Sequence, residues 1–161
     1  MLNSNDLEQF LDQRGVQARI LHLNEPTPTV PAAAQAVGVS PDKIVKSLLF
    51  LINQAPVLAI ATGVQDVDRR ALAKRFGVGR KRVKLAGPEE VLAITGYAVG
   101  AVPPIGWITA VEAYIDPSVL RHDRVYAGGG DINALMEISP DDIMRLSGAA
   151  ELELTASEDE S

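Results

Sequence analysis

The sequence predicts one domain of the mixed α/β class, in which helices surround a largely antiparallel sheet. Segments with helix start and stop signals alternate with short apolar segments of strand length, and two of these strands are close enough in the chain to form a hairpin. A length of 161 residues, 47% of them hydrophobic, suits a single core. We expect residues 1–150 to form this domain and residues 151–161, rich in Asp and Glu, to form an acidic, flexible tail.

Helices are expected where a capping side chain or a proline precedes an apolar segment and a glycine follows it. Asn5 is a candidate cap for the first helix, because Glu8 completes a capping box and Gly15 supplies the stop. A cap followed by a proline also occurs at Ser40-Pro41. The other helices are expected at residues 29–37, 66–76, 88–94 and 139–147.

Strands are expected where Val, Ile and Leu are dense between turn residues. Residues 45–52 and 56–62 are strongly apolar, and the turn-like Asn53-Gln54-Ala55 between them predicts a hairpin in the centre of the sheet. The other strands are expected at residues 18–23, 107–115, 124–127 and 134–138.

Composition and motifs exclude several classes of function. The chain has no cysteine, which excludes disulfides, thiolate catalysis and cysteine-based zinc sites. His22 and His122 lack the spacing of a zinc-binding pair, and we expect neither a metal nor a cofactor. The sequence has no nucleophile elbow, dinucleotide fingerprint or Walker motif. It also has no apolar run of membrane-spanning length and no signal peptide, so a cytoplasmic protein without membrane contact is expected.

The charge is unevenly distributed along the chain. Residues 69–84 contain eight lysines and arginines and no acid, although the net charge of the whole chain is −6. An acidic protein with one dense basic segment can stay soluble and still offer a local site for a polyanion, and nucleic acid is the natural candidate. The alternative is an exposed helix face and loop that are basic without having a partner.

Three further features have the character of a binding site. Lys46 stands at the start of an apolar strand, where a cation needs either exposure or an anionic partner. The segment 96–106 combines three glycines with Pro103-Pro104, which favours a rigid loop that presents backbone amides. The turn Gly128-Gly129-Gly130 allows a ligand to approach the backbone closely. Ordinary turns and a surface lysine are the alternatives.

The ordered combination of these motifs resembles the YbaK/EbsC family, the free-standing relatives of the editing domain of bacterial prolyl-tRNA synthetases. The resemblance extends from about Leu7 to Gly148 and is carried by residues 29–38, 43–48, 95–104, 115–116 and 128–130. It implies an α/β fold with a mixed, largely antiparallel sheet. It also implies that water hydrolyses the ester between a wrong amino acid and the 3′ end of a tRNA, as in Cys-tRNA(Pro) or Ala-tRNA(Pro).

The resemblance further implies roles for single positions. Lys46 matches a lysine that binds the phosphate or ribose of the terminal adenosine, and the loop from Gly100 to Pro104 matches one that surrounds the aminoacyl group. The glycine turn would form the opposite wall. The expected catalytic positions are Lys46, Gly100 and Gly130. The expected substrate-binding positions are Thr29, Val45, Ser47, Ala101, Val102, Pro103, Pro104, Gly128, Gly129 and Asp131.

The expected partner is the acceptor end of an aminoacyl-tRNA, and prolyl-tRNA synthetase is a second candidate partner. The residues expected to bind tRNA are Arg80, Lys81, Arg82 and Lys84. An aminoacyl ester is already activated, so a placed water, oriented amides and the neighbouring ribose hydroxyl can suffice without a conventional base. The pocket is expected to include Val45, Leu48 and Ile105.

One departure from the family pattern leaves other functions open. Some relatives have a histidine just after the glycine turn, where this chain has Asp131, Ile132 and Asn133. If Asp131 disturbs the site, the chain is a non-catalytic module that binds tRNA or a synthetase. A second alternative is a regulatory protein whose basic segment binds an acidic protein. The amino acid removed, the preferred tRNA and the oligomeric state stay open.

Overall fold

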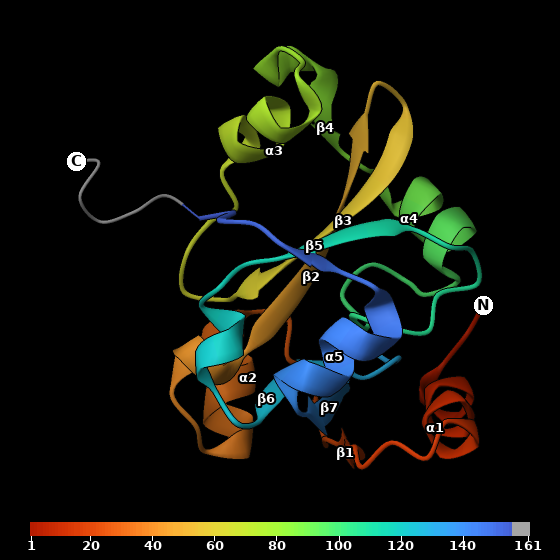
Figure 1. The fold of residues 1–161 in the computed structure, drawn as a ribbon. Coiled ribbons are helices and arrows are strands. Elements are labelled where there is room, and N and C mark those ends of the chain that lie inside the picture. Colours follow the sequence, from red (N-terminus) through yellow and green to blue (C-terminus); the bar gives the residue numbers. More distant parts are fainter. Residues whose placement is uncertain (156–161) are drawn as a thin grey trace.

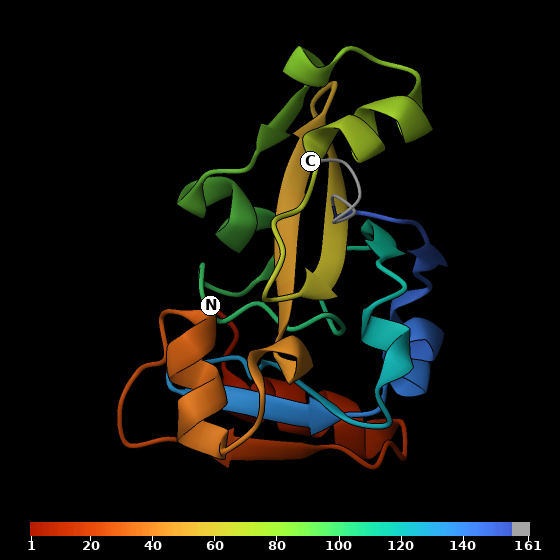
Figure 2. The same ribbon diagram turned by 90° about the vertical axis from the view of Figure 1, so that its left-hand side faces the viewer.

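The computed structural model describes residues 1–155 and confirms the mixed α/β class, with two sheets. The five-stranded sheet has the order β4 (Val83–Leu85), β2 (Val45–Ile52), β3 (Ala55–Thr62), β5 (Glu112–Ile115) and β8 (Ala150–Glu151). The three-stranded sheet has the order β1 (Arg19–His22), β7 (Ala134–Ile138) and β6 (Val125–Gly128). This smaller sheet runs across one end of the long β2–β3 hairpin (Figures 1 and 2).

The predicted hairpin is confirmed. Asn53 and Gln54 at its turn have φ angles of 49° and 71°, the left-handed conformation of a two-residue hairpin turn. β2 also pairs antiparallel with β4, whereas the β3–β5 and β5–β8 pairs are parallel. The three-stranded sheet is antiparallel throughout. The sheets are therefore largely antiparallel, as predicted, and parallel pairing between the named strands is confined to one side of the larger sheet.

Helices surround the two sheets in the described part of the chain. The α-helices are α1 (Ser4–Gln13), α2 (Val30–Val37), α3 (Arg69–Phe76), α4 (Pro88–Thr95) and α5 (Pro140–Ser147). The short 3-10 helices are η1 (Pro41–Lys43), η2 (Arg80–Arg82) and η3 (Val119–Arg121). Left-handed glycines end four of the α-helices at the predicted positions, Gly38, Gly77, Gly96 and Gly148. None of the helices within residues 1–155 has the length and apolar character that crossing a bilayer requires.

The first helix has a different cap from the predicted one. Its N-cap is Asn3 rather than Asn5, and the Asn3 side chain accepts hydrogen bonds from the backbone N–H groups of Asn5 at 2.9 Å and Asp6 at 3.2 Å. The Asp6 carboxylate in turn accepts from the Asn3 N–H at 2.8 Å. The capping box is therefore Asn3 with Asp6. A helix that starts at Ser4 buries Leu7 and places the Ser4 N–H within hydrogen-bond distance of the Asp131 carboxylate.

Two other elements are shorter than predicted. α3 begins three residues late because Asp68 caps it, accepting the N–H of Arg70 at 2.9 Å. The strand expected over residues 107–115 is confined to β5. The Trp107 side chain belongs to the preceding loop, where its Nε1–H donates to the Pro103 carbonyl at 2.8 Å.

The acidic tail does not begin where it was expected. Residues 150–151 form β8, and the Leu154 side chain is fully buried. The carboxylate of the buried Asp116 accepts the backbone N–H of Leu154 at 2.7 Å and that of Thr155 at 3.3 Å. The prediction of a flexible tail is thus wrong for residues 151–155, and the remaining tail residues, 156–161, lie outside the described residues.

The larger sheet has a hydrophobic cluster on each face. α3 packs on one face, where Phe50 and Tyr114 share a cluster with Leu154. The other face packs against the three-stranded sheet, so that Leu49 and Met136 belong to the same core. α3 and the turn of the β2–β3 hairpin lie at one end of the molecule, and the three-stranded sheet and α1 lie at the other (Figures 1 and 2).

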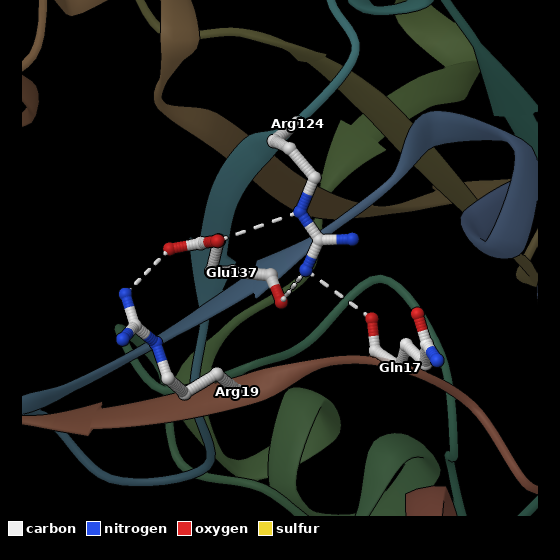
Figure 3. Close-up of polar contacts among 4 residues, drawn as sticks. All are labelled: Gln17, Arg19, Arg124 and Glu137. Atoms are coloured by element: carbon white, nitrogen blue, oxygen red, sulfur yellow. Dashed lines mark hydrogen bonds and ion pairs between the residues drawn. The ribbon is translucent and has the colours of Figure 1, made fainter.

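A charged network joins the edges of the three-stranded sheet (Figure 3). The Glu137 carboxylate of β7 lies between Arg19 of β1, at 2.9 Å, and the Nε of Arg124, at 3.4 Å. Arg124 also donates to the backbone carbonyl of Gln17 at 3.2 Å. Partial burial raises the pKa of Glu137, but the hydrogen bond and charge of Arg19, with help from Tyr126 and Arg124, outweigh this effect and lower the pKa below its ordinary value.

Replacing this carboxylate should therefore destabilise the protein in a pH-dependent way. A lowered folded-state pKa means that the stabilisation is present above the ordinary value of 4.5 and is lost as the pH falls through the lowered pKa. We expect Glu137→Gln to reduce the free energy of unfolding at pH 7 by about 0.5–1 kcal/mol, a small value because the arginines are solvent-screened. Urea unfolding at pH 7 and pH 3 measures this, with the exposed Glu8→Gln as the matched control. A loss of equal size at both pH values would contradict it.

Candidate functional site

A cavity of about 360 Å³ lies beside the part of β2 that β4 does not reach. β4 pairs only with residues 50–52, and the Ala86 N–H then donates to the Leu49 carbonyl at 2.9 Å. Among the described strands, only β3 pairs with residues 45–48. Backbone groups alternate between the two edges of an antiparallel strand, so the N–H and C=O of Ser47 face the same open edge as the Leu49 carbonyl. This open edge borders the cavity.

The cavity has mainly apolar walls. The lining residues come from the 27–30 loop and α2, from β2, from the segment after β4, from α4, and from the two glycine-containing loops. Among the described residues that line it, Lys46 is the one with a charged side chain, and no carboxylate lies within ion-pair distance of its ammonium. An apolar cavity with a single unpaired cation favours a ligand that has both an apolar part and an anionic or polar oxygen part.

Ser47 adds an unpaired hydroxyl to the same cavity. Its Oγ is buried, and among residues 1–155 it is the sole buried side-chain polar atom without a hydrogen-bond partner. Alternation along β2 places it on the same face as the buried Val45 and Leu49. Leaving a buried hydroxyl unpaired costs about 1–3 kcal/mol, so this atom is available to a ligand that can pair with it.

The two glycine-containing loops lie against each other and form one continuous wall. The Gly130 N–H donates to the Ala101 carbonyl at 3.0 Å, and a Cβ on Gly128 would overlap the Val102 carbonyl. Gly100, with a φ of +89°, and Gly128 both line the cavity. The glycine turn is therefore beside the 100–104 loop, and not across the cavity from it as expected. Only glycine at position 128 permits this backbone contact.

Buried hydrogen bonds hold the 96–106 loop in place. The Thr95 hydroxyl donates to the Val91 carbonyl at 2.7 Å and accepts the Tyr97 N–H at 3.1 Å. Tyr97 is buried beneath the loop, and this burial, with the nearby charges of Asp6 and Asp131, raises its pKa to about 12. The Tyr97 hydroxyl thus stays protonated at neutral pH. At the far end of the loop, the bond from Trp107 to the Pro103 carbonyl fixes the proline pair.

The structure brings together only part of the predicted site. Lys46, Gly100, Thr29, Val45, Ser47, Val102 and Gly128 line the cavity. Gly130, Gly129, Ala101, Pro103, Pro104 and Asp131 are not among the lining residues, and most of them are buried behind the wall. Ile105 also belongs to the core rather than to the lining, with no exposed surface. These residues support the wall, whereas the first group can contact a ligand.

Asp131 has a structural partner at the start of the chain. Its carboxylate accepts the N–H of Ser4 at 3.2 Å, which is one of the free amides at the start of α1. A Cβ on Gly130 would come within 2.8 Å of the Ser4 nitrogen, so α1 abuts the glycine turn closely. The carboxylate at position 131 is therefore explained by helix capping, a long-range contact that the sequence pattern does not reveal.

Several lining residues were missed by the sequence analysis. Most of them are apolar, and the fold brings them together from separate elements: Thr27, Pro28, Val30, Ala33, Ile44, Leu49, Leu85, Ala86, Val91, Val99, Ala134 and Leu135. Alternation along β2 could have found Leu49, because it shares a face with Val45 and Ser47. The others depend on tertiary packing and have no local signal.

The basic segment 69–84 divides into two parts. On α3, Arg69 lies 6.0 Å from the Phe50 ring centre and Arg75 lies 5.5 Å from that of Tyr114, so both cover aromatic rings of the core. The remaining cations at the turn and on β4 are exposed, and no carboxylate of the described chain lies within ion-pair distance of them: Arg80, Lys81, Arg82 and Lys84. Because Lys84 directly precedes lining residues of the cavity, the predicted tRNA-binding residues are continuous with the site along the chain.

The described part of the chain has no cluster of three or more metal-ligating side chains.

Comparison with known proteins gives the site its context. The sequence model of the aminoacyl-tRNA editing domain matches residues 24–146. EbsC of Enterococcus faecalis, named provisionally as a Cys-tRNA(Pro)/Cys-tRNA(Cys) deacylase, is 27% identical over 128 residues, which cover 79% of this chain and 77% of EbsC.

Two further relatives show the same domain in different settings. The proline–tRNA ligase of Thermotoga neapolitana is 36% identical over 107 residues, which are 65% of this chain but only 18% of that enzyme. A crystal structure described provisionally as a trans-editing enzyme for prolyl-tRNA synthetase has a TM-score of 0.88 and 33% identity, and the match covers 96% of this chain and 97% of that one. Residues 24–146, which match the family model, include every residue that lines the cavity. They make up most of the chain, which therefore belongs to the aminoacyl-tRNA editing domain family.

Proposed function

We propose that this protein is a free-standing hydrolase that deacylates mischarged tRNA, with Cys-tRNA(Pro) and Ala-tRNA(Pro) as the candidate substrates. The observation that carries this proposal is the cavity in which a lone cation, an unpaired hydroxyl and glycine backbone meet among apolar walls. Membership of the editing domain family and the names of its relatives support the same activity. The proposed place of action is the cytoplasm, with prolyl-tRNA synthetase as a candidate partner.

Lys46 would hold the 3′ end of the tRNA. Its ammonium is a compact charge suited to a phosphate or to ribose oxygens, and it has no competing carboxylate in the described chain. The aminoacyl group would then lie along the open edge of β2, where the Ser47 hydroxyl and backbone can pair with its polar atoms. Lys46 in this arrangement binds and orients the substrate and does not attack it.

The reaction requires positioning more than a strong base. A water oxygen attacks the ester carbonyl carbon, the bond from that carbon to the ribose oxygen breaks, and a proton from the water ends on the ribose oxygen. Backbone amides of the loop that contains Gly100 could stabilise the developing oxyanion, and one such donor is worth about 3–4 kcal/mol of the barrier. Holding the water and ester in place contributes further.

The walls of the cavity favour a small, uncharged amino acid. The lining residues of the described chain include no acid and no histidine that could pair with a charged side chain. One methylene changes binding by only about 1–3 kcal/mol, so the volume of the cavity must do most of the discrimination. This supports cysteine or alanine as the amino acid removed.

The non-catalytic alternative has lost its main support. It depended on Asp131 disturbing the site, but the Asp131 carboxylate bonds to the Ser4 amide and is not among the lining residues. Hydrolysis therefore remains the function that the site supports best.

Replacing Lys46 should remove most of the activity. We expect Lys46→Ala to lower deacylation by roughly 10- to 100-fold, because a hydrogen-bonded charged contact to the substrate is lost. Release of labelled amino acid from a panel of mischarged tRNAs measures this and also identifies the substrate. Lys43→Ala, an exposed neighbour outside the lining, is the matched control. Full activity of Lys46→Ala would contradict the site.

Removing the Ser47 hydroxyl should move stability and activity in opposite directions. Ser47→Ala deletes a buried group without a partner, so we expect the free energy of unfolding to rise by about 1 kcal/mol. The value of kcat/KM should fall, and Ser47→Thr, which keeps a hydroxyl, should retain more activity. Urea unfolding and deacylation kinetics test this together. A Ser47→Ala variant that is destabilised and fully active would show that the hydroxyl has a structural role only.

The exposed cations should set the salt dependence of tRNA binding. We expect the triple change of Arg80, Lys81 and Arg82 to Ala to raise KM for tRNA and to reduce the slope of log Kd against log salt by about 2, since each lost phosphate contact contributes about 0.7–0.9. The matched control replaces Arg14, Arg121 and Arg145, three cations on other elements. An unchanged slope, or an equal effect of the control, would show that these three cations face solvent and do not contact tRNA. The alternative is that the basic segment binds an acidic protein. A binding assay with bulk tRNA as the competitor distinguishes this alternative from tRNA binding.

A further inference from the structure

The open edge of β2 is the place that a longer β4 would occupy. Leu85, the last residue of β4, pairs with Phe50, and the Ala86 N–H still donates to the Leu49 carbonyl at 2.9 Å. The chain then leaves the sheet at Gly87, which is the N-cap of α4. On this side of β2, the strand positions opposite the two residues before Leu49 therefore have no partner in the described chain.

The second of these positions, opposite Ser47, suits a single amino acid. Both backbone groups of Ser47 face the open edge, and a residue opposite them in an antiparallel pair donates its N–H to the C=O and accepts the N–H with its own C=O. An aminoacyl ester has the same donor and acceptor, its α-ammonium and its ester carbonyl, on either side of one Cα atom. It can therefore add to this edge as a strand of one residue, as extended peptides do at longer open edges.

The position of Lys46 determines the direction of this added residue. If the amino acid continues the antiparallel direction of β4, its ester oxygen points toward the N-terminus of β2, and the ribose lies opposite Lys46. The lone cation of the lining then stands beside the sugar and phosphate of the tRNA end. The reverse direction would send the tRNA toward Ala86, where the chain already occupies the edge. The antiparallel direction is therefore the one that fits.

The same pairing places the side chain of the amino acid. Residues directly opposite each other in an antiparallel pair have their side chains on one face, with Cβ atoms about 4.5–5.5 Å apart. The side chain of an L-amino acid would therefore lie beside the unpaired Ser47 hydroxyl. Leu49 is on this face of β2, and Val91 and Val102 line the cavity and belong to the same cluster. A D-amino acid with the same backbone bonds would direct its side chain to the opposite face.

We propose that Ser47 recognises the aminoacyl group by strand addition, and that the protein therefore selects L-amino acids with a free α-amino group. The Ser47 carbonyl accepts from the α-ammonium, and its N–H donates to the ester carbonyl. A group attached to the amine would have to lie opposite Leu48, where the chain passes from Ala86 to Gly87. Peptidyl and other N-blocked esters are therefore rejected. This assignment rests on the proposed function.

The selectivity is tested with three esters of one tRNA. They carry the amino acid that the panel of mischarged tRNAs identifies, in its L-form, its N-acetylated L-form and its D-form. Each enzymatic rate is divided by the spontaneous rate of the same ester, because acetylation of the amine also changes the reactivity of the ester. We expect kcat/KM to be at least about tenfold lower for the acetylated ester and for the D-ester, since the first loses a charged hydrogen bond and the second turns its side chain away.

The outcomes separate this assignment from the proposed function. Hydrolysis of the acetylated ester or of the D-ester as fast as that of the free L-ester would overturn recognition by strand addition and leave the hydrolase standing. Failure to hydrolyse any free L-ester of the panel would overturn the proposed function and the assignment with it.

The place of the side chain is tested on two neighbouring residues of β2. Ser47→Val adds volume on the face of the bound side chain, so we expect it to lower kcat/KM for cysteinyl-tRNA at least about threefold more than for alanyl-tRNA. Leu48→Val, on the other face of the strand, is the matched control and should change both substrates by the same factor. The ratio of the two substrates does not depend on the folded fraction of a variant. An unchanged ratio in Ser47→Val, or the same shift in Leu48→Val, would overturn the assignment.

Discussion

The site depends on one constraint in the sheet, the early end of β4. Because β4 pairs with only three residues of β2, the strand continues past it with one edge open. Three consecutive residues, Val45, Lys46 and Ser47, can therefore all border the cavity, although their side chains alternate between the faces of the sheet. Leu85, the last residue of β4, and Ala86 after it line the cavity, and the exposed Lys84 directly precedes them. One interrupted strand pair thus determines both where a ligand fits and where cations adjoin it.

The second wall is made of backbone rather than side chains. Gly128 lies so close to the Val102 carbonyl that any side chain would separate the two loops. Backbone amides held by neighbouring hydrogen bonds do not need to reorganise when charge develops on a bound ester, and this is the physical basis of oxyanion stabilisation. For the proposed hydrolysis, a wall of this kind reduces the need for polar side chains, which agrees with the mainly apolar lining.

Local signals in the sequence predicted the elements and the position of Lys46, and they failed where distant segments meet. The β2–β3 hairpin, the glycine stops of four helices and the lysine at the start of β2 all follow from short-range patterns. The role of Asp131 could not be predicted, because its partner Ser4 is 127 residues away in sequence. The anchoring of Leu154 was missed for the same reason: a run of acidic residues suggests exposure, whereas a single leucine and the Asp116 carboxylate fix the backbone. The apolar lining from α2, β4 and α4 likewise exists only in the folded chain.

The contact between α1 and the glycine turn has a mechanical consequence. Asn3 and Ser4 press against Gly130 from behind, and Gly130 is bonded to the carbonyl of Ala101 in the wall of the cavity. The first turn of α1 thus supports this wall, and a displacement of the turn would be passed to the loop that contains Ala101 through two backbone contacts. The rigidity of the wall is therefore set in part by residues at the beginning of the sequence, far from any atom that touches a ligand.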